Sequence, residues 1–232
     1  MSIIAAVYLD TAVINFFKNG TPITIETKDL TLRSIQETDL DFMQKLYTDP
    51  ITMRLFADNE HRLEKKGEES WKEEQMKAAK ERVDTFVKLW TVERIPFSGF
   101  LISTKNDPRP IGFIAPEFDN NPGQLEIVFA ITSIEQRQGF GSQAVDAIVQ
   151  RYIPALIKNH YKIYDKPLAV NGAPVTKMCA TTRWDNGSSL HIQEKAGMRK
   201  TGKTADQWDQ MHEIYSITYT NPPLEESNCL LC

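Results

Sequence analysis

Two glycines and a glutamine form the sequence pattern with the clearest chemical meaning. Gln136, Gly139 and Gly141 stand between a predicted strand at 124–131 and a predicted helix that begins after Ser142. Glycine lets the backbone adopt positive φ and approach a ligand closely, and the amides at a helix start point at an anion. The pattern therefore favours a pyrophosphate-binding turn, with a ligand-free glycine-rich helix entry as the alternative. It is not a P-loop, because Gly-Lys-Ser/Thr is absent, and it lacks the third glycine and βαβ unit of the dinucleotide fingerprint.

The elements on either side of this turn predict an α+β fold. Alternating apolar residues predict an antiparallel meander of three strands, at 97–104, 111–118 and 124–131. The helix after Ser142 has one apolar face through Tyr152, and Pro154 should kink or end it. A further strand at 177–182, a short helix capped by Asn186 and ended at Gly197, and a last strand at 211–219 follow.

The N-terminal part of the chain predicts strands and then two helices. Residues 1–33 are rich in β-forming residues, with a hairpin turn at Asn19 and Gly20. A helix is expected at 38–47, and a second, highly charged helix at 61–94. The expected buried face of that second helix comprises Met76, Ala79, Val83, Phe86 and Trp90. Because no repeat or linker interrupts this order, we expect one domain over 1–222, with 61–94 as a helical insertion and 223–232 as a flexible tail.

Composition narrows the class of protein. The 232 residues carry 27 Lys plus Arg and 31 Asp plus Glu, a formal net charge of −4, and 41% of them are hydrophobic. These values are typical of a soluble globular protein and argue against nucleic-acid binding as the main function. Cys179, Cys229 and Cys232 are too few and too clustered for a disulfide framework, so we expect a reducing, cytoplasmic location. The four histidines are scattered, and no metal site is predicted.

The ordered set of motifs resembles the GNAT superfamily of N-acetyltransferases. The meander, the Gln136-x-x-Gly139-x-Gly141 turn, the next strand, Asn186-x-x-Ser189 and the segment from Glu194 to Met198 occur in the order of that family. The Leu30–Arg33 strand and the acidic helix start at 37–40 are similar to the ribosomal-protein N-acetyltransferase branch. The resemblance covers residues 28–220. It implies a mixed, mostly antiparallel central sheet with flanking helices, and a cofactor cleft between splayed strands at 124–131 and 177–183.

The resemblance also implies acetyl-CoA as the acetyl donor. The main-chain amides of one continuous segment would bind the pyrophosphate: Gln136, Arg137, Gln138, Gly139, Phe140, Gly141 and Ser142. The strand residues Phe129, Ala130 and Ile131 would pair with the pantetheine arm, and Asn186 would contact the same arm.

Acetyl transfer in this family needs few side chains, because an amine attacks the thioester directly in a ternary complex. Glu126 is the candidate general base, with an outward-facing strand carboxylate as the alternative. Ser189 is the candidate acid or water-orienting group, with a first-turn helix residue that satisfies backbone amides as the alternative. Many relatives have a catalytic tyrosine near 193–195, where this chain has none, so Tyr215 is a substitute to consider. His191 is expected to be structural.

Two kinds of function remain open. The first is an acetyl-CoA-dependent N-acetyltransferase whose acceptor is a protein N-terminus, a lysine or a small amine. The second is a non-catalytic module of the same fold that binds acyl-CoA or a partner protein. The acceptor site is expected near 61–94 and 160–174.

The last four residues, Cys229 to Cys232, match the C-a-a-X pattern for prenylation, although no basic patch precedes them. Membrane association is expected only if Cys229 is prenylated, and a flexible tail is the alternative.

Overall fold

The computed structural model describes the backbone of residues 5–9, 12–16, 23–158, 162–163, 166–167 and 169–220, and the side chains of 23–158 and 169–220. The statements below refer to these residues. The Asn19-Gly20 turn, the tail at 223–232 and the C-a-a-X pattern lie outside them.

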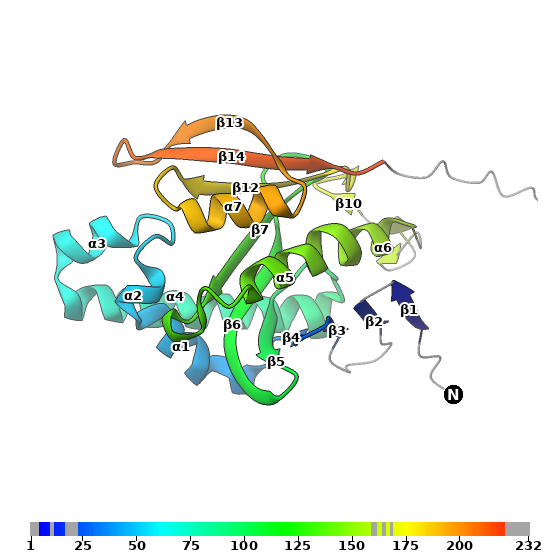
Figure 1. Ribbon diagram of the computed structural model, residues 1–232, viewed down its shortest axis with the longest axis horizontal. Helices are drawn as coiled ribbons and strands as arrows, with labels where there is room; N and C mark the ends of the chain where they lie inside the picture. The colour runs from blue at the N-terminus through cyan, green and yellow to red at the C-terminus, as the bar shows by residue number, and fades with distance from the viewer. Residues whose placement is uncertain are drawn as a thin grey trace, which may run out of the picture.

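A single mixed sheet forms the centre of the fold, as expected (Figure 1). Its strands follow the order β1-β2-β3-β4-β5-β6-β7-β12-β14-β13, and every neighbouring pair is antiparallel except β7 with β12. The strands are β1 (Ala5–Leu9), β2 (Ala12–Phe16), β3 (Thr24–Glu26), β4 (Leu30–Ser34), β5 (Phe100–Thr104), β6 (Asp107–Phe118), β7 (Gln124–Ile131), β12 (Lys177–Arg183), β13 (Arg199–Ala205) and β14 (Met211–Thr218). Two short ribbons add β8 (Lys162–Ile163) with β9 (Lys166–Pro167), and β10 (Ala169–Val170) with β11 (Ala173–Pro174).

Helices cover both faces of this sheet. One face carries η1 (Glu37–Asp39), α1 (Leu40–Thr48), α2 (Pro50–Met53), α3 (Asn59–Lys66), α4 (Glu68–Lys88) and its π-helical end η2 (Leu89–Glu93). After β7 and the short η3 (Ser133–Glu135), the other face carries α5 (Phe140–Asp146), the π-helical η4 (Ala147–Tyr152), α6 (Ile153–Lys158) and α7 (Gly187–Lys195). In Figure 1, α5, α6 and α7 lie in front of the sheet and α4 lies behind it.

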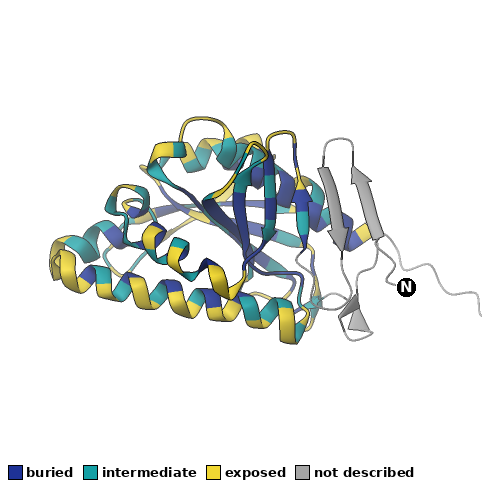
Figure 2. Cartoon of the chain, turned by 90° about the horizontal axis from the view of Figure 1, so that it is seen from below, coloured by how far each residue is buried: buried dark blue, intermediate teal, exposed yellow. Residues whose placement is uncertain are grey.

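Alternation along the strands supplies a hydrophobic core to each helical layer. In β6, Ile114 belongs to the core shared with α5 and α6, whereas Phe113 and Ala115 belong to the core shared with α1 and α4. Figure 2 shows the buried sheet between the helices and the alternation of buried and exposed turns along α4. Because side chains on a strand point to opposite faces in turn, the same alternation decides which polar side chains face each layer.

The long helix predicted at 61–94 is divided by a break. Gly67 has φ 76° and ψ 162°, an extended conformation with positive φ that a helix cannot contain, so α3 ends there and α4 begins at Glu68. The buried face of α4 consists of Trp71, Gln75, Ala79, Val83 and Phe86, while Met76 is exposed. The predicted buried face is therefore confirmed at Ala79, Val83 and Phe86 and wrong at Met76.

Pro154 neither ends nor interrupts the helix after β7. The residues before it form the π-helical η4, and α6 continues from Ile153 to Lys158. A π turn shifts the hydrogen-bond pattern by one residue, so the missing proline N–H falls where the pattern changes from π to α.

The predicted meander is confirmed, with different turn boundaries. Only Lys105 and Asn106 connect β5 to β6, so the residues predicted as a turn at 107–110 belong to the strand. The β5–β6 register shifts on either side of Ser103, where β6 contains Pro108 and Pro110. Strand β13 was not predicted, because its residues are almost all exposed and carry no apolar alternation.

Candidate functional site

Strands β7 and β12 run parallel but separate after a short paired stretch. Their register joins Lys177 to Gln124, Met178 to Leu125 and Cys179 to Glu126, and ends there. On its other edge, β7 stays paired with β6 as far as Ile131. The edge of β7 from 127 to 131 therefore faces a V-shaped gap between strands, with Glu126 at the vertex. These are the splayed strands that the resemblance implied at 124–131 and 177–183.

The glycine turn lies at the open end of this V. After β7 and η3, Arg137 has φ 64° and Gly139 has φ 84°, and α5 begins at Phe140. The side chain of Gln136 donates to the carbonyl of Ile131 (3.0 Å), which fastens the turn to the end of β7. No side chain caps α5. The first amides of an uncapped helix have no intrahelical acceptor, so this turn presents donors and a positive dipole end to an anion.

The two glycines of the turn have different tasks. Gly139 needs its positive φ, and a Cβ placed on it would meet nothing within 4 Å. A Cβ on Gly141 would approach Ile192 Cδ1 of α7 at 3.1 Å. Gly141 therefore allows α5 to pack closely on α7, whereas Gly139 leaves open space in front of the turn. Gln136, Arg137 and Gln138 are exposed, and Phe140, Gly141 and Ser142 are partly exposed, so a ligand can reach this segment.

The other expected donor-binding residues lie at the end of β7 and at the start of α7. Ala130 and Ile131 are buried and Phe129 is partly buried, at the end of β7 that β12 leaves unpaired. Asn186 is the N-cap of α7, and its side-chain oxygen accepts the N–H of Ser189 at 3.2 Å. This geometry leaves the side-chain NH₂ of Asn186 as a donor. Ser189 provides the capped N–H, so it does not itself cap the helix.

Glu126 is half-buried at the vertex of the V. Its neighbours Leu125 and Ile127 belong to the core under α5 and α6, so the Glu126 side chain points to the opposite face, toward α1 and α4. Burial raises the pKa of Glu126, hydrogen bonds from Thr181 oppose this, and the charges of Asp119 and Glu117 raise it further. A half-buried carboxylate whose pKa is raised above the ordinary Glu value is suited to accept a proton.

Cys179 lies directly across the vertex from Glu126. It is buried, accepts a hydrogen bond from Gln124 Nε2 at 3.2 Å, and its Sγ lies 3.6 Å from Asp119 Oδ2. Burial raises the pKa of the Cys179 thiol to about 12, with Glu126 and Asp119 adding to the effect. Cys179 is therefore a neutral thiol beside the candidate base.

Two residues near Glu126, Glu117 and Arg82, were not identified from the sequence. Glu117 of β6 pairs in register with Glu126 of β7, and Arg82 of α4 binds Glu117. The register of the predicted meander could have placed Glu117 beside Glu126. No sequence signal marked Arg82, because it stands in a helix whose charges alternate in sign.

The remaining sequence candidates lie elsewhere. Tyr215 is buried in the core under α5 and α6, and its hydroxyl donates to Glu194 Oε1 at 2.8 Å. That hydrogen bond, with burial, raises the pKa of Tyr215. His191 is exposed on α7 rather than packed. Among the side chains that the structure describes, no group of His, Cys, Asp and Glu is arranged to hold a metal ion. No helix in the described part of the chain is long and apolar enough to cross a membrane.

A pocket of about 490 Å³ lies between α2, α3 and α4. A hydrogen bond and an ion pair connect α2 and α3 to the ends of the splayed strands. It is lined by Pro50, Ile51, Arg54, Asn59, Glu60, Leu63, Glu64 and Trp71. Thr52 of α2 accepts the N–H of Ser133, just beyond β7, at 2.8 Å. Glu60 of α3 pairs with Arg183, the last residue of β12, at 2.8 Å. Figure 1 shows α2 and α3 at the end of the molecule toward which β7 and β12 point.

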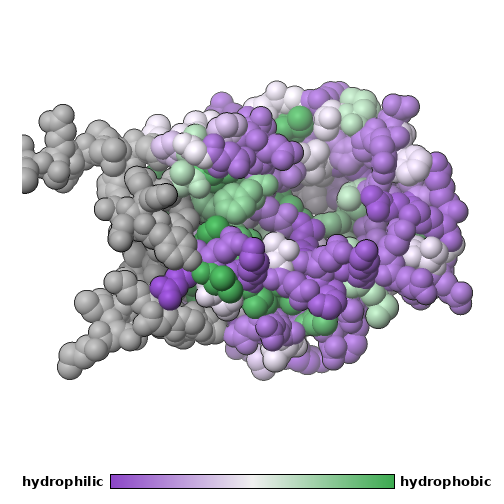
Figure 3. Space-filling view, turned by 180° about the vertical axis from the view of Figure 1, so that it is seen from behind, coloured by the Kyte–Doolittle hydropathy of each residue, from purple (hydrophilic) through white to green (hydrophobic). Residues whose placement is uncertain are grey.

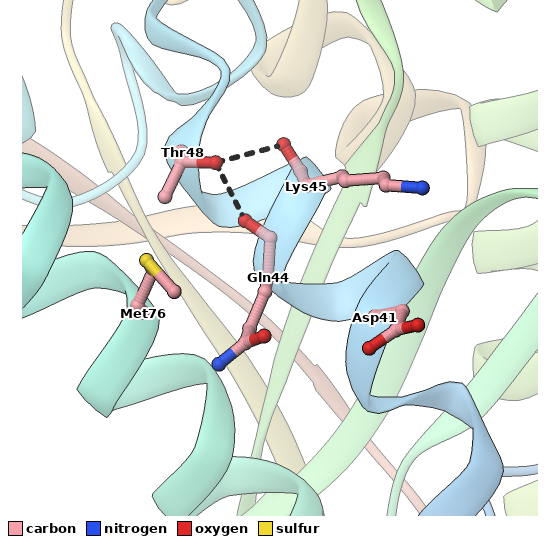
Figure 4. A pocket seen from close by; sticks show the side chains of 5 residues that line it. All are labelled: Asp41, Gln44, Lys45, Thr48 and Met76. Atoms are coloured by element: carbon pink, nitrogen blue, oxygen red, sulfur yellow. Dashed lines mark hydrogen bonds between the residues drawn. The ribbon is translucent and has the colours of Figure 1, made fainter.

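A smaller pocket of about 200 Å³ lies on the outer side of α1 and α4 (Figure 4). It is lined by Asp41, Gln44, Lys45, Thr48 and Met76. The Thr48 hydroxyl donates to the carbonyl of Gln44 at 2.8 Å, so it is already used within α1. This shallow pocket has no link to the splayed strands.

Comparison with known proteins agrees with this arrangement. The sequence model of the acetyltransferase (GNAT) domain matches residues 29–199. No curated protein matches the chain. A GNAT-family acetyltransferase from Bacillus anthracis superimposes with a TM-score of 0.59 at 15% identity, covering 84% of this chain and 98% of that one. A ribosomal-protein-S5-alanine acetyltransferase from Vibrio fischeri gives 0.56 at 17% identity, covering 86% and 97%. A spermidine N-acetyltransferase from Vibrio cholerae, in complex with CoA and spermine, gives 0.56 at 16% identity, covering 82% and 95%.

Proposed function

The chain belongs to the GNAT family of N-acetyltransferases, and on that premise we propose that it transfers the acetyl group of acetyl-CoA to a primary amine by direct attack in a ternary complex. The observation that carries this proposal is the V between β7 and β12, with the uncapped start of α5 at its open end and Glu126 at its vertex. The acceptor is a protein N-terminus, a lysine or a small amine.

The donor site follows the chain from the turn to the vertex. The amides of 136–142 bind the pyrophosphate at the start of α5. The unpaired edge of Phe129, Ala130 and Ile131 pairs with the pantetheine arm, and the free NH₂ of Asn186 donates to it. The structure of the spermidine N-acetyltransferase with CoA supports a CoA site in this fold. The thioester then lies near the vertex, within reach of Glu126.

The chemistry needs a base and a proton for the leaving group. The ammonium group of the acceptor gives one proton to Glu126 and becomes a nucleophilic amine. Its nitrogen attacks the thioester carbonyl, the C–N bond forms and the C–S bond breaks. Ser189, directly or through a water, passes a proton to the departing CoA thiolate and takes up the second proton that the amide nitrogen loses, so the serine hydroxyl is restored. Backbone amides of the splayed strand stabilise the oxyanion.

The acceptor approaches from the face that carries α1 and α4, because Glu126 points there. The pocket between α2, α3 and α4 receives the part of the acceptor beyond the amine, with Ile51, Leu63 and Trp71 as an apolar wall. Glu64 stands at the same pocket and favours a cationic molecule, whereas Glu60 is already paired with Arg183 and Arg54. Figure 3 shows hydrophilic side chains over most of the described part of this side of the molecule, with hydrophobic side chains gathered near its centre.

An acceptor screen with detection of free CoA thiol tests the proposed function. Acetyl-CoA alone should raise the melting temperature of the protein, since it binds the folded state. Thiol release should then depend on one class among N-terminal peptides, lysine peptides, polyamines and aminoglycosides. A thermal shift without thiol release for every class would favour a non-catalytic acyl-CoA-binding module. No thermal shift at all would contradict the donor site.

A further inference from the structure

A partly buried ion pair joins the helical layer to the strand beside Glu126. Arg82 of α4 donates to Glu117 from Nε (3.0 Å) and from Nη2, which contacts both carboxylate oxygens. Its Nη1 donates to the hydroxyl of Tyr47 in α1 at 3.0 Å. The Arg82 and Glu117 side chains are only 23% and 27% exposed. All three guanidinium nitrogens are engaged, so Glu117 is held in one geometry.

Glu117 and Glu126 are direct neighbours across the β6–β7 ladder. Their register pairs them, so both side chains project from the same face of the sheet. Side chains paired in this way have Cβ atoms about 5 Å apart, and like charges at such positions repel each other. Two free carboxylates here would compete for one proton, as carboxylates that share a site do.

We propose that Arg82 is a positioning residue for acetyl transfer, because its forked ion pair with Glu117 leaves Glu126 as the single carboxylate at the vertex that is free to take the proton of the amine. This inference rests on the proposed role of Glu126 as the base. It adds to the machinery of the reaction a residue of α4, a helix whose charged side chains had no expected role in the chemistry.

Arg82 reaches the surroundings of Glu126 through Glu117, to which it is bound. Glu117 faces it from β6, Asp119 from the β6–β7 turn, and Cys179 and Thr181 from β12. Behind Glu117 stand Arg82 from α4 and Tyr47 from α1. Of these groups, Arg82 alone carries a positive charge. Asp119 is already held by Asn121 through its backbone N–H (2.8 Å) and its side-chain NH₂ (2.7 Å).

The sign of each substitution follows from this arrangement. Arg82→Met removes the positive charge and leaves Glu117 uncompensated, so protonated Glu126 becomes more favourable and its titration moves to higher pH. Glu117→Gln removes the like charge and leaves Arg82, so the titration moves to lower pH. The double variant Arg82→Met/Glu117→Gln removes a neutral pair and should return close to the wild type. Each single change should be about one pH unit.

Carboxyl ¹³C NMR titration of the full chain measures this without an acceptor. The Glu126 signal is the one that the Glu126→Gln variant lacks. Arg82→Met should raise the midpoint of the Glu126 titration. The same change in the Glu117→Gln background should also raise it, and this comparison tests the inference if Arg82→Met alone does not fold. Arg82→Lys should keep most of the wild-type midpoint, and Lys80→Met, an equal charge change on the exposed face of α4, should leave it unmoved. An Arg82→Met midpoint equal to that of the wild type would overturn the inference.

The rate assay separates this inference from the proposed function. With the amine that gives the fastest thiol release, the acid limb of kcat/KM should move with the NMR midpoints. A merely structural role of Arg82 would lower the rate at every pH and leave the limb in place, which contradicts the inference alone. Full activity in Glu126→Gln would instead contradict the assignment of the base.

Discussion

At the scale of single residues, Glu126 combines partial burial with a place at the vertex of the splayed strands. Burial raises its pKa, and the nearby charges of Asp119 and Glu117 add to the effect, while Thr181 keeps it hydrogen-bonded. The residue type and strand position of Glu126 could be predicted from the sequence. Of its environment, only Glu117 could be placed from the register of the predicted meander, because Cys179 and Arg82 come from β12 and α4 and approach Glu126 only through the folding of distant segments.

Replacement of Glu126 by Gln should slow acetyl transfer by about 100-fold or more, the usual effect of losing a general base. The rate of the wild type should fall as pH decreases through the raised pKa of Glu126, because the base must be ionised. Steady-state kcat/KM between pH 5 and 9 measures both effects. A Gln variant that keeps the wild-type rate and pH profile would show that another group takes the proton.

Glu126→Gln should lower activity, but it should raise the stability of the folded protein relative to the wild type as pH increases. Because the pKa of Glu126 is raised in the folded state, the folded protein binds this proton more tightly than the unfolded chain does. Its stability relative to Glu126→Gln should therefore fall as pH rises from about 4.3, the ordinary Glu value, to the folded pKa, and stay constant above it. Urea unfolding of both proteins across this range checks the trend. A difference that is independent of pH would contradict the raised pKa.

At the scale of elements, the donor site depends on how α5 begins. Gly139→Val forces a β-branched residue into a positive φ, which costs roughly 1–2 kcal/mol, and fills the space in front of the amides. We expect acetyl-CoA affinity to fall at least about tenfold, measured by isothermal titration calorimetry. Gly67→Val is the matched control, because Gly67 has a similar φ of 76° and open surroundings but lies between α3 and α4. Equal losses of affinity in both variants would contradict the placement of the donor site.

A set of polar contacts around Asp58, here called the clasp, connects the start of α3 with the β13–β14 loop. Asp58 accepts hydrogen bonds from Arg62 Nε (2.6 Å), Gln207 Nε2 (2.8 Å) and Trp208 Nε1 (3.1 Å). Lys65 lies over the Trp208 ring, with its Nζ 3.5 Å from the ring centroid. Partial burial of Asp58 acts to raise its pKa, but the hydrogen bonds of Arg62, Trp208 and Gln207 outweigh it and hold the pKa below the ordinary value.

Asp58→Ala should free α3 from the β13–β14 loop and cost about 1–3 kcal/mol of stability. Amide hydrogen exchange over 59–66 should become faster, while exchange in β5–β7 should not change. The contribution of Asp58 should be present above pH about 3.9, the ordinary Asp value, and should be lost as pH falls through its lower folded pKa. Asp84→Ala, an exposed change on α4, is the control. Unchanged exchange in α3 would show that the clasp does not hold the helix.

Elements with local signals were predictable. Strand β7 was predicted with its observed bounds, and the helix α7 was predicted between the cap at Asn186 and the stop at Gly197. The break at Gly67 and the passage of the helix through Pro154 were not, because each depends on a backbone conformation that the surrounding structure selects. The hydrophobic period of the chain does not contain that information.

At the scale of the whole molecule, the splayed sheet separates two tasks. The proposed donor site comprises the end of β7, the turn before α5 and the start of α7, and its main segment is continuous in the chain, so a short motif could indicate it. The proposed acceptor face is assembled from α2, α3, α4 and the end of β12, which are far apart in the sequence. That assembly explains why the sequence indicates the donor and leaves the acceptor open.

We propose that residues 1–222 form one domain, because β7 and β12 join strands from both ends of the chain in one sheet. Differential scanning calorimetry should therefore show a single transition. Acetyl-CoA at 100 times its Kd should stabilise the folded state by about 2.7 kcal/mol, which raises that one transition as a whole. Two transitions, of which acetyl-CoA moves only one, would contradict a single domain.

The most direct test of the account is thiol release from acetyl-CoA, with acetyl-CoA binding measured on the same samples. The wild type should release CoA thiol in a one-to-one ratio with acetylated amine. Glu126→Gln should show the same thermal shift with acetyl-CoA and release thiol about 100-fold more slowly or less. Equal rates in the two proteins, or the absence of any acetyl-CoA-dependent thermal shift in the wild type, would contradict the account.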